Sequence, residues 1–354
     1  MEQEEIRVMQ NRDLIEIVVP CFNEQECIEP LYKKLCEVLG TGGVQSEESL
    51  QVLSDERVPV GKEKCAKNLQ FDWAVLFVDD GSKDETLLKI KALEATDTRG
   101  RIRHVSFSRN FGKESAIYAG LEKSRGDYVV LMDADLQHPP ELVLSMYEAI
   151  KAGYDCCGAR RVSRKGEPVF RSLLSRLFYR VINRVTSMNL VPGGSDYRMM
   201  SRKMVDAIVS MTERERFIKG IMSWVGFDTK WIEYENVERA FGATKWSFVG
   251  LIRYAWHGFI SFATTPLRVC VVFGLMVVVA AFVYATALFH QVKYGSRDWT
   301  DGTTAILLIL FFFGVTIVIL GIIGEYMARI YLELKHRPIY IEKEVSEGKE
   351  TETK

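Results

Sequence analysis

The chain has 354 residues, of which 46 are basic and 47 acidic, so its formal net charge is −1. This balance argues against a general nucleic-acid-binding surface, and we expect no nucleic-acid partner. Seven scattered cysteines without a CxxC pair argue against a disulfide framework or a cysteine-based zinc site. The charged segment 1–13 lacks the apolar core of a signal peptide and is interpreted as an N-terminal tail.

Short apolar segments alternate with helical patterns over the first half of the chain. Near-continuous apolar strands between helices are typical of a parallel sheet covered on both faces, so the pattern predicts an α/β fold. In such sheets the polar groups after each strand form the ligand crevice. The crevice is therefore expected to gather residues 20–24, 79–80 and 133–135. Strands are expected at 15–19, 73–78, 102–107 and 127–132, and helices at 28–39, 86–93 and 113–123.

Three segments do not fit this alternation. Residues 41–70 are polar and mixed in charge, which indicates a surface insertion. The segment 167–185 has one apolar face and an arginine row that includes Arg176 and Arg180, which predicts an amphipathic helix on an anionic membrane surface. An ordinary domain helix with a solvated basic face is the alternative. The aromatic segment 241–266 predicts a second interfacial helix.

The C-terminal third contains two long segments without a charged residue. As helices, residues 269–289 and 303–324 would each extend about 30 Å, which is one hydrocarbon thickness. They predict a two-helix transmembrane hairpin over 267–332, although a buried soluble helix pair has the same composition. Basic residues flank the outer ends of the pair, so we expect a multi-pass cell-membrane protein with the catalytic domain, both termini and the tail 333–354 in the cytoplasm.

Two carboxylates follow the predicted strand 127–132 directly. Asp133 and Asp135, on either side of Ala134, offer the oxygen ligands that Mg²⁺ or Mn²⁺ prefers, and a substrate phosphate can complete the coordination. A metal held there would neutralise a departing diphosphate. The motif is weak by itself, because aspartate is common in turns.

Several motifs occur together with this one. The segments VVPCFNE (18–24), VDDGSKDET (78–86), SRNFGKESA (108–116) and MDADLQHPPE (132–141) resemble family 2 glycosyltransferases of the GT-A fold. Downstream, GGSDYRMMSR (193–202), RFIKGIMSWVGF (216–227) and RAFGATKWSF (239–248) resemble the polyprenyl-phosphate branch. That branch includes the dolichol-phosphate mannose synthases and the bacterial undecaprenyl-phosphate glycosyltransferases. The predicted hairpin with RPIYIEKE (337–344) looks most like the bactoprenol glucosyltransferases.

The resemblance implies a Rossmann-like GT-A catalytic domain over 14–240, and it implies roles for individual residues. Asp133 and Asp135 would hold the metal, and Arg239, Lys245, Arg176 and Arg180 would meet the acceptor or its phosphate. Simpler readings stay open, since Asp79 can close a turn, Asp84 can cap a helix, and Arg160 or Arg161 can be a solvated charge. The nucleotide-sugar would contact Pro20, Phe22, Glu24, Val78, Asp80, Asp133, Ala134, Gln137 and Arg160.

Asp196 and Asp135 are the candidate catalytic residues. The family position that matches Asp196 is often called the catalytic base. An acceptor phosphate monoester, however, has a second pKa of about 6 and is mostly dianionic at pH 7. It needs positioning more than deprotonation. Asp196 could therefore orient Arg198, a sugar hydroxyl or the acceptor itself.

The resemblance implies an inverting transfer of a hexose from a nucleotide-sugar to undecaprenyl or another polyprenyl phosphate, for modification of a cell-envelope glycan. UDP-glucose is the favoured donor. A GDP-mannose-dependent mannose synthase, or a transferase of N-acetylglucosamine or modified arabinose, is the alternative, and a non-catalytic membrane assembly partner is a remote one. No glutamine is followed by the RW of a QxxRW motif, which argues against a processive polysaccharide synthase. Relatives with this tail imply a homo-oligomer, such as a tetramer, in which residues 337–344 pair with a neighbour.

Overall fold

The computed structural model describes residues 12–40, 71–161, 191, 193–214, 216–234 and 302–346, with scattered helical residues between 272 and 294. The predicted insertion 41–70 and the predicted interfacial helices 167–185 and 241–266 lie outside these residues. The chain divides into two compact units, and each is described by itself. Residues 1–180, 188–246 and 338–354 form the first unit, and residues 181–187 and 247–337 form the second.

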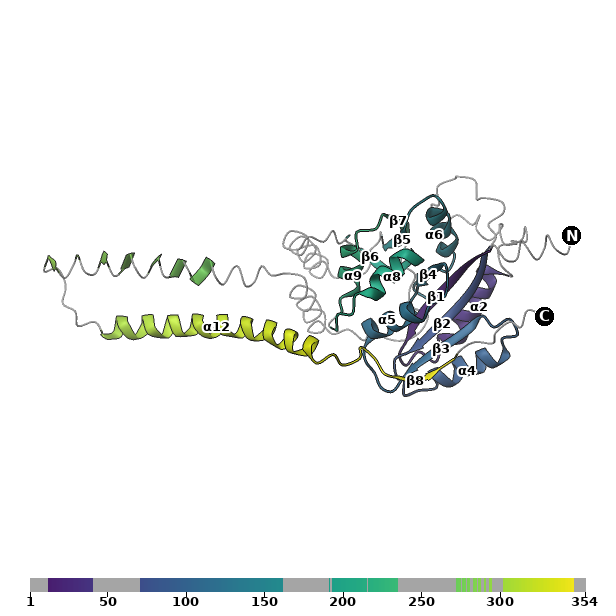
Figure 1. Ribbon diagram of the computed structural model, residues 1–354, viewed down its shortest axis with the longest axis horizontal. Helices are drawn as coiled ribbons and strands as arrows, with labels where there is room; N and C mark the ends of the chain where they lie inside the picture. Colours follow the sequence, from purple (N-terminus) through teal and green to yellow (C-terminus); the bar gives the residue numbers. More distant parts are fainter. Residues whose placement is uncertain are drawn as a thin grey trace. The chain divides into compact units, whose positions relative to one another are not determined.

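The first unit is built on an eight-stranded mixed sheet with the order β7-β5-β6-β4-β1-β2-β3-β8 (Figure 1). Strand β1 pairs in parallel with β2 and β4, β2 with β3, and β5 with β7, whereas β6 and β8 run antiparallel to their neighbours. The predicted, mostly parallel α/β sheet is thereby confirmed. The strands are β1 (Asp13–Cys21), β2 (Phe71–Asp79), β3 (Ile102–Phe107), β4 (Tyr128–Leu131), β5 (Cys156–Arg161), β6 (Gly194–Ser201), β7 (Thr229–Tyr234) and β8 (Glu342–Val345).

Helices cover both faces of this sheet. One continuous core packs the sheet against α2, α4 and α6, and it includes the large buried rings of Trp73, Phe77 and Tyr147. On the other face α5 contacts β1, β2 and α8. Gly120 allows this close contact, because a Cβ there would lie 2.2 Å from Val18 Cγ1. The helices are α2 (Ile28–Leu39), α4 (Thr86–Thr96), α5 (Lys113–Lys123), α6 (Leu142–Lys151), α8 (Arg202–Ser210) and α9 (Ile218–Trp224).

The C-terminal tail is part of the sheet. Strand β8 runs antiparallel to β3, and the N–H of Ser346 donates to the carbonyl of His104 across 2.8 Å (Figure 1). The Tyr340 ring stacks on Phe107 with the ring centroids 4.8 Å apart. The resemblance implied that residues 337–344 pair with a neighbouring subunit. In the structure the part of this segment from Tyr340 onward lies on β3 of the same chain, where β8 occupies the edge of the sheet. The homo-oligomer stays a prediction.

The second unit contains α12 (Gly302–Leu334). Residues Phe311–Leu334 within it have a mean hydropathy of 2.0 and the length and composition of a membrane span, the only such helix in the described part of the chain. The helix continues past the predicted end of the span at 324, where a Glu325–Arg329 ion pair at 3.6 Å joins two charges one turn apart. The described residues in 272–290 are also helical.

Candidate active site

The polar ends of the strands meet as the sequence pattern predicted. The N–H of Asp80, after β2, donates to the carbonyl of Cys21 at the end of β1 across 2.9 Å. Strand β6 runs antiparallel to β4, with Arg198 opposite Leu131, so the residues that begin β6 lie beside those that follow β4. This topology brings Asp196 next to Asp133, although 63 positions separate them in the sequence.

Lys113 joins these two carboxylates. Its Nζ lies 2.6 Å from Asp133 Oδ1 and 3.4 Å from Asp196 Oδ2. Lys113 is the first residue of α5 and follows Gly112, which has a positive φ of 100°. Burial alone would lower the pKa of Lys113, but the two carboxylates outweigh it and raise the pKa well above its usual value. The sequence analysis quoted the motif around Lys113 without giving this residue a role.

Cations also determine the charge state of Asp196. Burial would raise the pKa of Asp196, but the ammonium groups of Lys219 and Lys113 and the guanidinium of Arg198 hold it well below the usual range. Lys219 Nζ lies 3.7 Å from Asp196 Oδ1. The pKa of Asp133 is likewise lowered, because Lys113 outweighs the effect of burial. A carboxylate held in its ionised form by three cations is a weak proton acceptor.

His138 connects the loop after β4 to the start of β6. Its Nδ1 accepts the N–H of Asp133 across 3.2 Å, which assigns the proton to Nε2, and Nε2 lies 3.0 Å from Ser195 Oγ. The imidazole stacks on Tyr197, with centroids 4.8 Å apart and an interplanar angle of 14°. Burial lowers the pKa of His138, which favours the neutral ring that these contacts require. His138 was also missed, and its only sequence signal is its place directly after the Asp133–Gln137 loop.

The loop Asp133–Gln137 contains a strained residue. Leu136 has a φ of +58°, an uncommon conformation for a bulky side chain. The sharp turn it produces lets the N–H of Gln137 donate to Asp135 Oδ1 across 3.2 Å. Such strain is concentrated at functional sites, where the surrounding structure enforces it. Here the turn at Leu136 is accompanied by the hydrogen bond that restrains the Asp135 carboxylate.

The carboxylates of this loop fit a divalent cation that is shared with a substrate. Among the described residues no group of three or more His, Cys, Asp or Glu side chains forms a complete metal cage. Mg²⁺ is commonly bound by one or two carboxylates, with water and substrate phosphate as the other ligands. Asp133 and Asp135 supply such a pair of hard oxygen donors, so the residues present fit the predicted metal once a diphosphate is bound.

The loops after β1 and β2 are held together by reciprocal hydrogen bonds. The N–H of Asn23 donates to Ser82 Oγ, and the N–H of Lys83 donates to Asn23 Oδ1, both across 2.9 Å. The N–H of Glu24 donates to Thr86 Oγ1 across 2.9 Å. These contacts fix the loop that contains Phe22 and Glu24, both predicted to line the nucleotide pocket, beside the end of β2. Pro20 lies opposite Val78 in the same pair of strands.

The paired aspartates after β2 have different surroundings. Asp79 accepts the N–H of Ser82 across 3.1 Å and the hydroxyl of Ser106 across 2.8 Å, so the turn-closing role is confirmed. Asp80 accepts the N–H groups of Phe111 at 2.6 Å and Gly112 at 2.9 Å. Burial raises the pKa of Asp80 to about 6, against the opposing effect of these two N–H groups.

Of the basic residues that were predicted to bind the donor or the acceptor, the structure describes only Arg160. Arg160, on β5, lies opposite Gly194 in the register and forms a 3.7 Å ion pair with Glu233 on β7. The Arg160 side chain is 43% exposed, so this ion pair lies at the surface. The predicted acceptor residues Arg176, Arg180, Arg239 and Lys245 lie outside the described residues.

Two family models match the chain: Glycosyl transferase family 2 over residues 63–209, and the GtrB C-terminal hairpin over residues 265–330. A Bacillus subtilis (strain 168) protein that carries the name glycosyltransferase CsbB is 39% identical over 333 residues, which is 94% of this chain and 92% of that protein. The bactoprenol glucosyl transferase of Shigella phage SfV is 35% identical over 327 residues, which is 92% of this chain and 97% of that protein. The chain belongs to glycosyl transferase family 2.

This family 2 glycosyltransferase is therefore an enzyme, as predicted, and the hairpin match together with α12 associates it with a membrane. A solved structure of glucosyl-3-phosphoglycerate synthase from Mycobacterium tuberculosis, in complex with Mn²⁺, UDP-glucose and phosphoglyceric acid, is similar at 17% identity. The similarity covers 72% of this chain and 79% of that chain, with a TM-score of 0.42. The family assignment therefore rests on the sequence relatives and not on this structure.

Proposed function

We propose that this glycosyltransferase moves glucose from UDP-glucose to undecaprenyl phosphate, with inversion at the anomeric carbon, for modification of a cell-envelope glycan. The observation that carries the proposal is the row of alternating charges Asp133–Lys113–Asp196–Lys219 at the ends of the strands. Such a row can place an anionic donor and an anionic acceptor on either side of one carboxylate. Relatives named bactoprenol glucosyl transferase, from several Shigella phages, support the choice of sugar and lipid.

In the proposed reaction an oxygen of the acceptor phosphate attacks the anomeric carbon of glucose. The bond from that carbon to the β-phosphate oxygen of UDP breaks, and its electron pair leaves with UDP. A dianionic acceptor becomes a monoanionic phosphodiester while UDP takes up the additional negative charge, so no proton has to be removed. Asp133 and Asp135 would hold Mg²⁺ or Mn²⁺, which supplies charge neutralisation for the diphosphate.

The residues around Asp196 favour a positioning role for this carboxylate. Its lowered pKa makes it a poor general base, and the dianionic acceptor does not require one. Flanked by Lys113 and Lys219, it can hold both ammonium groups in place for the phosphates on either side. Much of the barrier in such a displacement is overcome by alignment of the reacting groups.

The nucleotide is proposed to bind at the ends of β1 and β2, against Pro20, Phe22, Glu24, Val78 and Asp80. The carboxylate of Asp80 is suited to accept a hydrogen bond from a base N–H, because it is already fixed by two backbone donors. Ala134 and Gln137 would face the diphosphate and sugar, and Arg160 would approach them from β5. The catalytic domain is proposed to lie on the cytoplasmic side of the cell membrane, where nucleotide-sugars are made.

The test is a transfer assay with detergent-purified protein, undecaprenyl phosphate, MnCl₂ and a panel of labelled UDP- and GDP-sugars. Label entering the organic phase from UDP-glucose alone, and its loss in Asp135→Ala, is the expected result. Transfer from GDP-mannose or from another UDP-sugar would replace the proposed donor. The absence of any lipid-linked product, despite Mn²⁺-dependent UDP binding, would show that the acceptor is wrong. The exposed Asp206→Ala on α8 is the matched control, because its 3.6 Å pair with Arg202 lies on the helix surface.

A further inference from the structure

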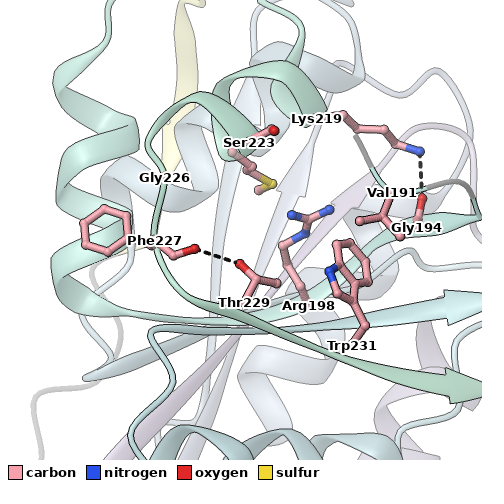
Figure 2. Close-up of a pocket in the computed structure, with 10 residues that line it drawn as sticks. Val191, Gly194, Arg198, Lys219, Ser223, Gly226, Phe227, Thr229 and Trp231 are labelled. Atoms are coloured by element: carbon pink, nitrogen blue, oxygen red, sulfur yellow. Dashed lines mark hydrogen bonds between the residues drawn. The ribbon is translucent and has the colours of Figure 1, made fainter. Parts of the chain in front are cut away.

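A pocket of roughly 330 Å³ lies beside Asp196, between α9 and the strands β6 and β7 (Figure 2). The guanidinium of Arg198 points into it, and Lys219 enters from α9. Arg198 is only 6% exposed, and its Nε has no hydrogen-bond partner among the described residues. A buried, incompletely paired guanidinium is costly to retain, so a ligand that completes its hydrogen bonding is expected.

Two glycines allow the floor of this pocket to be flat. A Cβ on Gly158 would lie 2.8 Å from Trp231 Cζ3, and a Cβ on Gly194 would lie 2.9 Å from Trp231 Cη2. The indole of Trp231 can therefore lie directly on β5 and β6. Arg198 sits over this ring, with its Cζ 5.5 Å from the ring centroid. The stacked ring and the hydrogen bond from Arg198 to the carbonyl of Ser195, across 2.9 Å, hold the guanidinium in place.

The lining combines positive charge with apolar surface. Arg198 and Lys219 are its charged members, and no carboxylate lies among the described lining residues. Met222 is a lining residue and supplies apolar surface. The indole of Trp231 supplies more (Figure 2), whereas the Phe227 ring is turned away from the pocket and only its backbone lies beside Thr229. This chemistry suits an anion attached to an apolar group, because the anion pairs with the two cations while its apolar part contacts the rest of the wall.

The position of the pocket connects it to the reaction. Lys219 Nζ contacts both the candidate catalytic residue and the pocket wall. It lies 3.7 Å from Asp196 Oδ1 and donates to the carbonyl of Gly194, a lining residue, across 3.3 Å. Asp133 and Lys113 lie on the other side of Asp196. A phosphate bound between Arg198 and Lys219 would thus lie across Asp196 from Asp133. We call residues Asp133–Gln137 the donor loop, because they are proposed to hold the metal and the diphosphate.

From this geometry we infer that the pocket binds the phosphate of the acceptor lipid and its first isoprene carbons, held by Arg198 and Lys219 over Trp231. The inference rests on the proposed function and identifies the part of the site that receives the acceptor. The volume is at the lower end of the range for small-ligand pockets, which suits a phosphate with a short apolar extension.

The test compares Lys219→Met and Arg198→Lys with the wild-type protein. Lys219→Met removes one positive charge at constant length, and Arg198→Lys keeps the charge but loses the fork of donors. For both variants the KM for undecaprenyl phosphate is expected to rise at least tenfold, while the KM for the donor stays within about twofold. The matched control is Lys230→Met, because Lys230 is adjacent to Trp231 on β7 but lies over the Tyr154 ring instead of the pocket.

A binding experiment separates this inference from the proposed reaction. Geranyl phosphate, titrated calorimetrically into the full-length protein without donor, is expected to bind the wild type and Lys230→Met, and to bind Lys219→Met at least tenfold more weakly. UDP with Mn²⁺ is expected to bind all three equally. This result would stand even if no sugar were transferred to undecaprenyl phosphate. Equal binding of geranyl phosphate by all three proteins, or a selective loss of UDP binding in Lys219→Met, would overturn the inference.

Discussion

His138 Nε2 lies 3.0 Å from Ser195 Oγ, so a buried ring that follows the donor loop contacts the residue directly before Asp196. Through its Nδ1 the same imidazole accepts the N–H of Asp133 across 3.2 Å. Both nitrogens are used, and each bond restrains one of the two loops that present carboxylates. His138 is therefore a positioning residue for the two loops that present Asp133 and Asp196.

We expect His138→Ala to lower kcat by about 10- to 100-fold, the range seen when a supporting hydrogen bond behind a site is removed. His138→Asn should retain more activity, because its Oδ1 can still accept the Asp133 N–H. Steady-state transfer kinetics measure both. His104→Ala is the control, since His104 is also buried, pairs with Glu94 at 2.6 Å and lies on β3. Equal loss of kcat in His104→Ala would indicate general destabilisation instead.

The ammonium of Lys113 competes with a metal ion for Asp133. In Lys113→Met, Asp133 and Asp196 lose the positive charge between them, and a divalent cation would relieve their repulsion. We therefore expect Mn²⁺ to bind about tenfold more tightly while kcat falls about 100-fold. Titration followed by electron paramagnetic resonance gives the first quantity, and the transfer assay gives the second. Weaker Mn²⁺ binding in this variant would mean that Lys113 supports the shape of the site more than its charge.

Asp80 provides a dependence of stability on pH. Its folded-state pKa of about 6 lies above the ordinary value of 3.8, so its ionisation disfavours the folded state. This contribution to stability is present below the ordinary pKa and is lost as the pH rises through about 6. Asp80→Asn removes the charge and keeps a hydrogen-bond acceptor, so it should raise the melting temperature relative to wild type more at pH 8 than at pH 4.5. Equal differences at both pH values would show that Asp80 does not titrate in this range.

The glycines beneath Trp231 offer a steric test of the pocket floor. Gly158→Ala places a Cβ 2.8 Å from the indole, which must tilt toward the pocket. Overpacking of this kind costs about 1–3 kcal/mol. We expect the melting temperature to fall and the acceptor KM to rise about tenfold, with the donor KM unchanged. The double variant Gly158→Ala/Trp231→Phe, with a smaller ring, should recover part of the stability. A rise in donor KM alone would contradict this assignment of the floor.

The sequence was sufficient for elements whose signal is local. The strand at 102–107 and the helix at 113–123 have the predicted bounds, because the buried strand and the buried centre of the helix each appear in the sequence as a local run of mostly apolar residues. The two carboxylates after β4 were also identified from their position at the end of a strand. Turn closure by Asp79 was one of the readings left open, and it is a local contact, because its partner Ser82 is three residues away.

The gathering of the strand ends after β1, β2 and β4 was predicted, but the contacts made through the antiparallel strand β6 were not. Lys113 and Asp196 are 83 positions apart, and His138 and Ser195 are 57 positions apart. Both pairs depend on the antiparallel placement of β6 against β4, for which the composition of neither strand gives a signal. The pocket floor depends on the register that sets Gly158 opposite both Arg198 and Trp231. Without that register, two glycines and a tryptophan are ordinary residues in three separate motifs.

Strand β8 has a consequence for how the protein is made. Its partner β3 leaves the ribosome long before it, since Ser106 on β3 and Glu344, its register partner on β8, are 238 positions apart. Domains generally fold during synthesis from the N-terminus, so the edge of β3 stays open until β8 (Glu342–Val345) emerges. An open edge can pair with another chain and lead to aggregation. A chain cut short after α12 would keep every residue assigned to catalysis here, but its β3 edge would stay open, and we expect such a chain to self-associate during biogenesis.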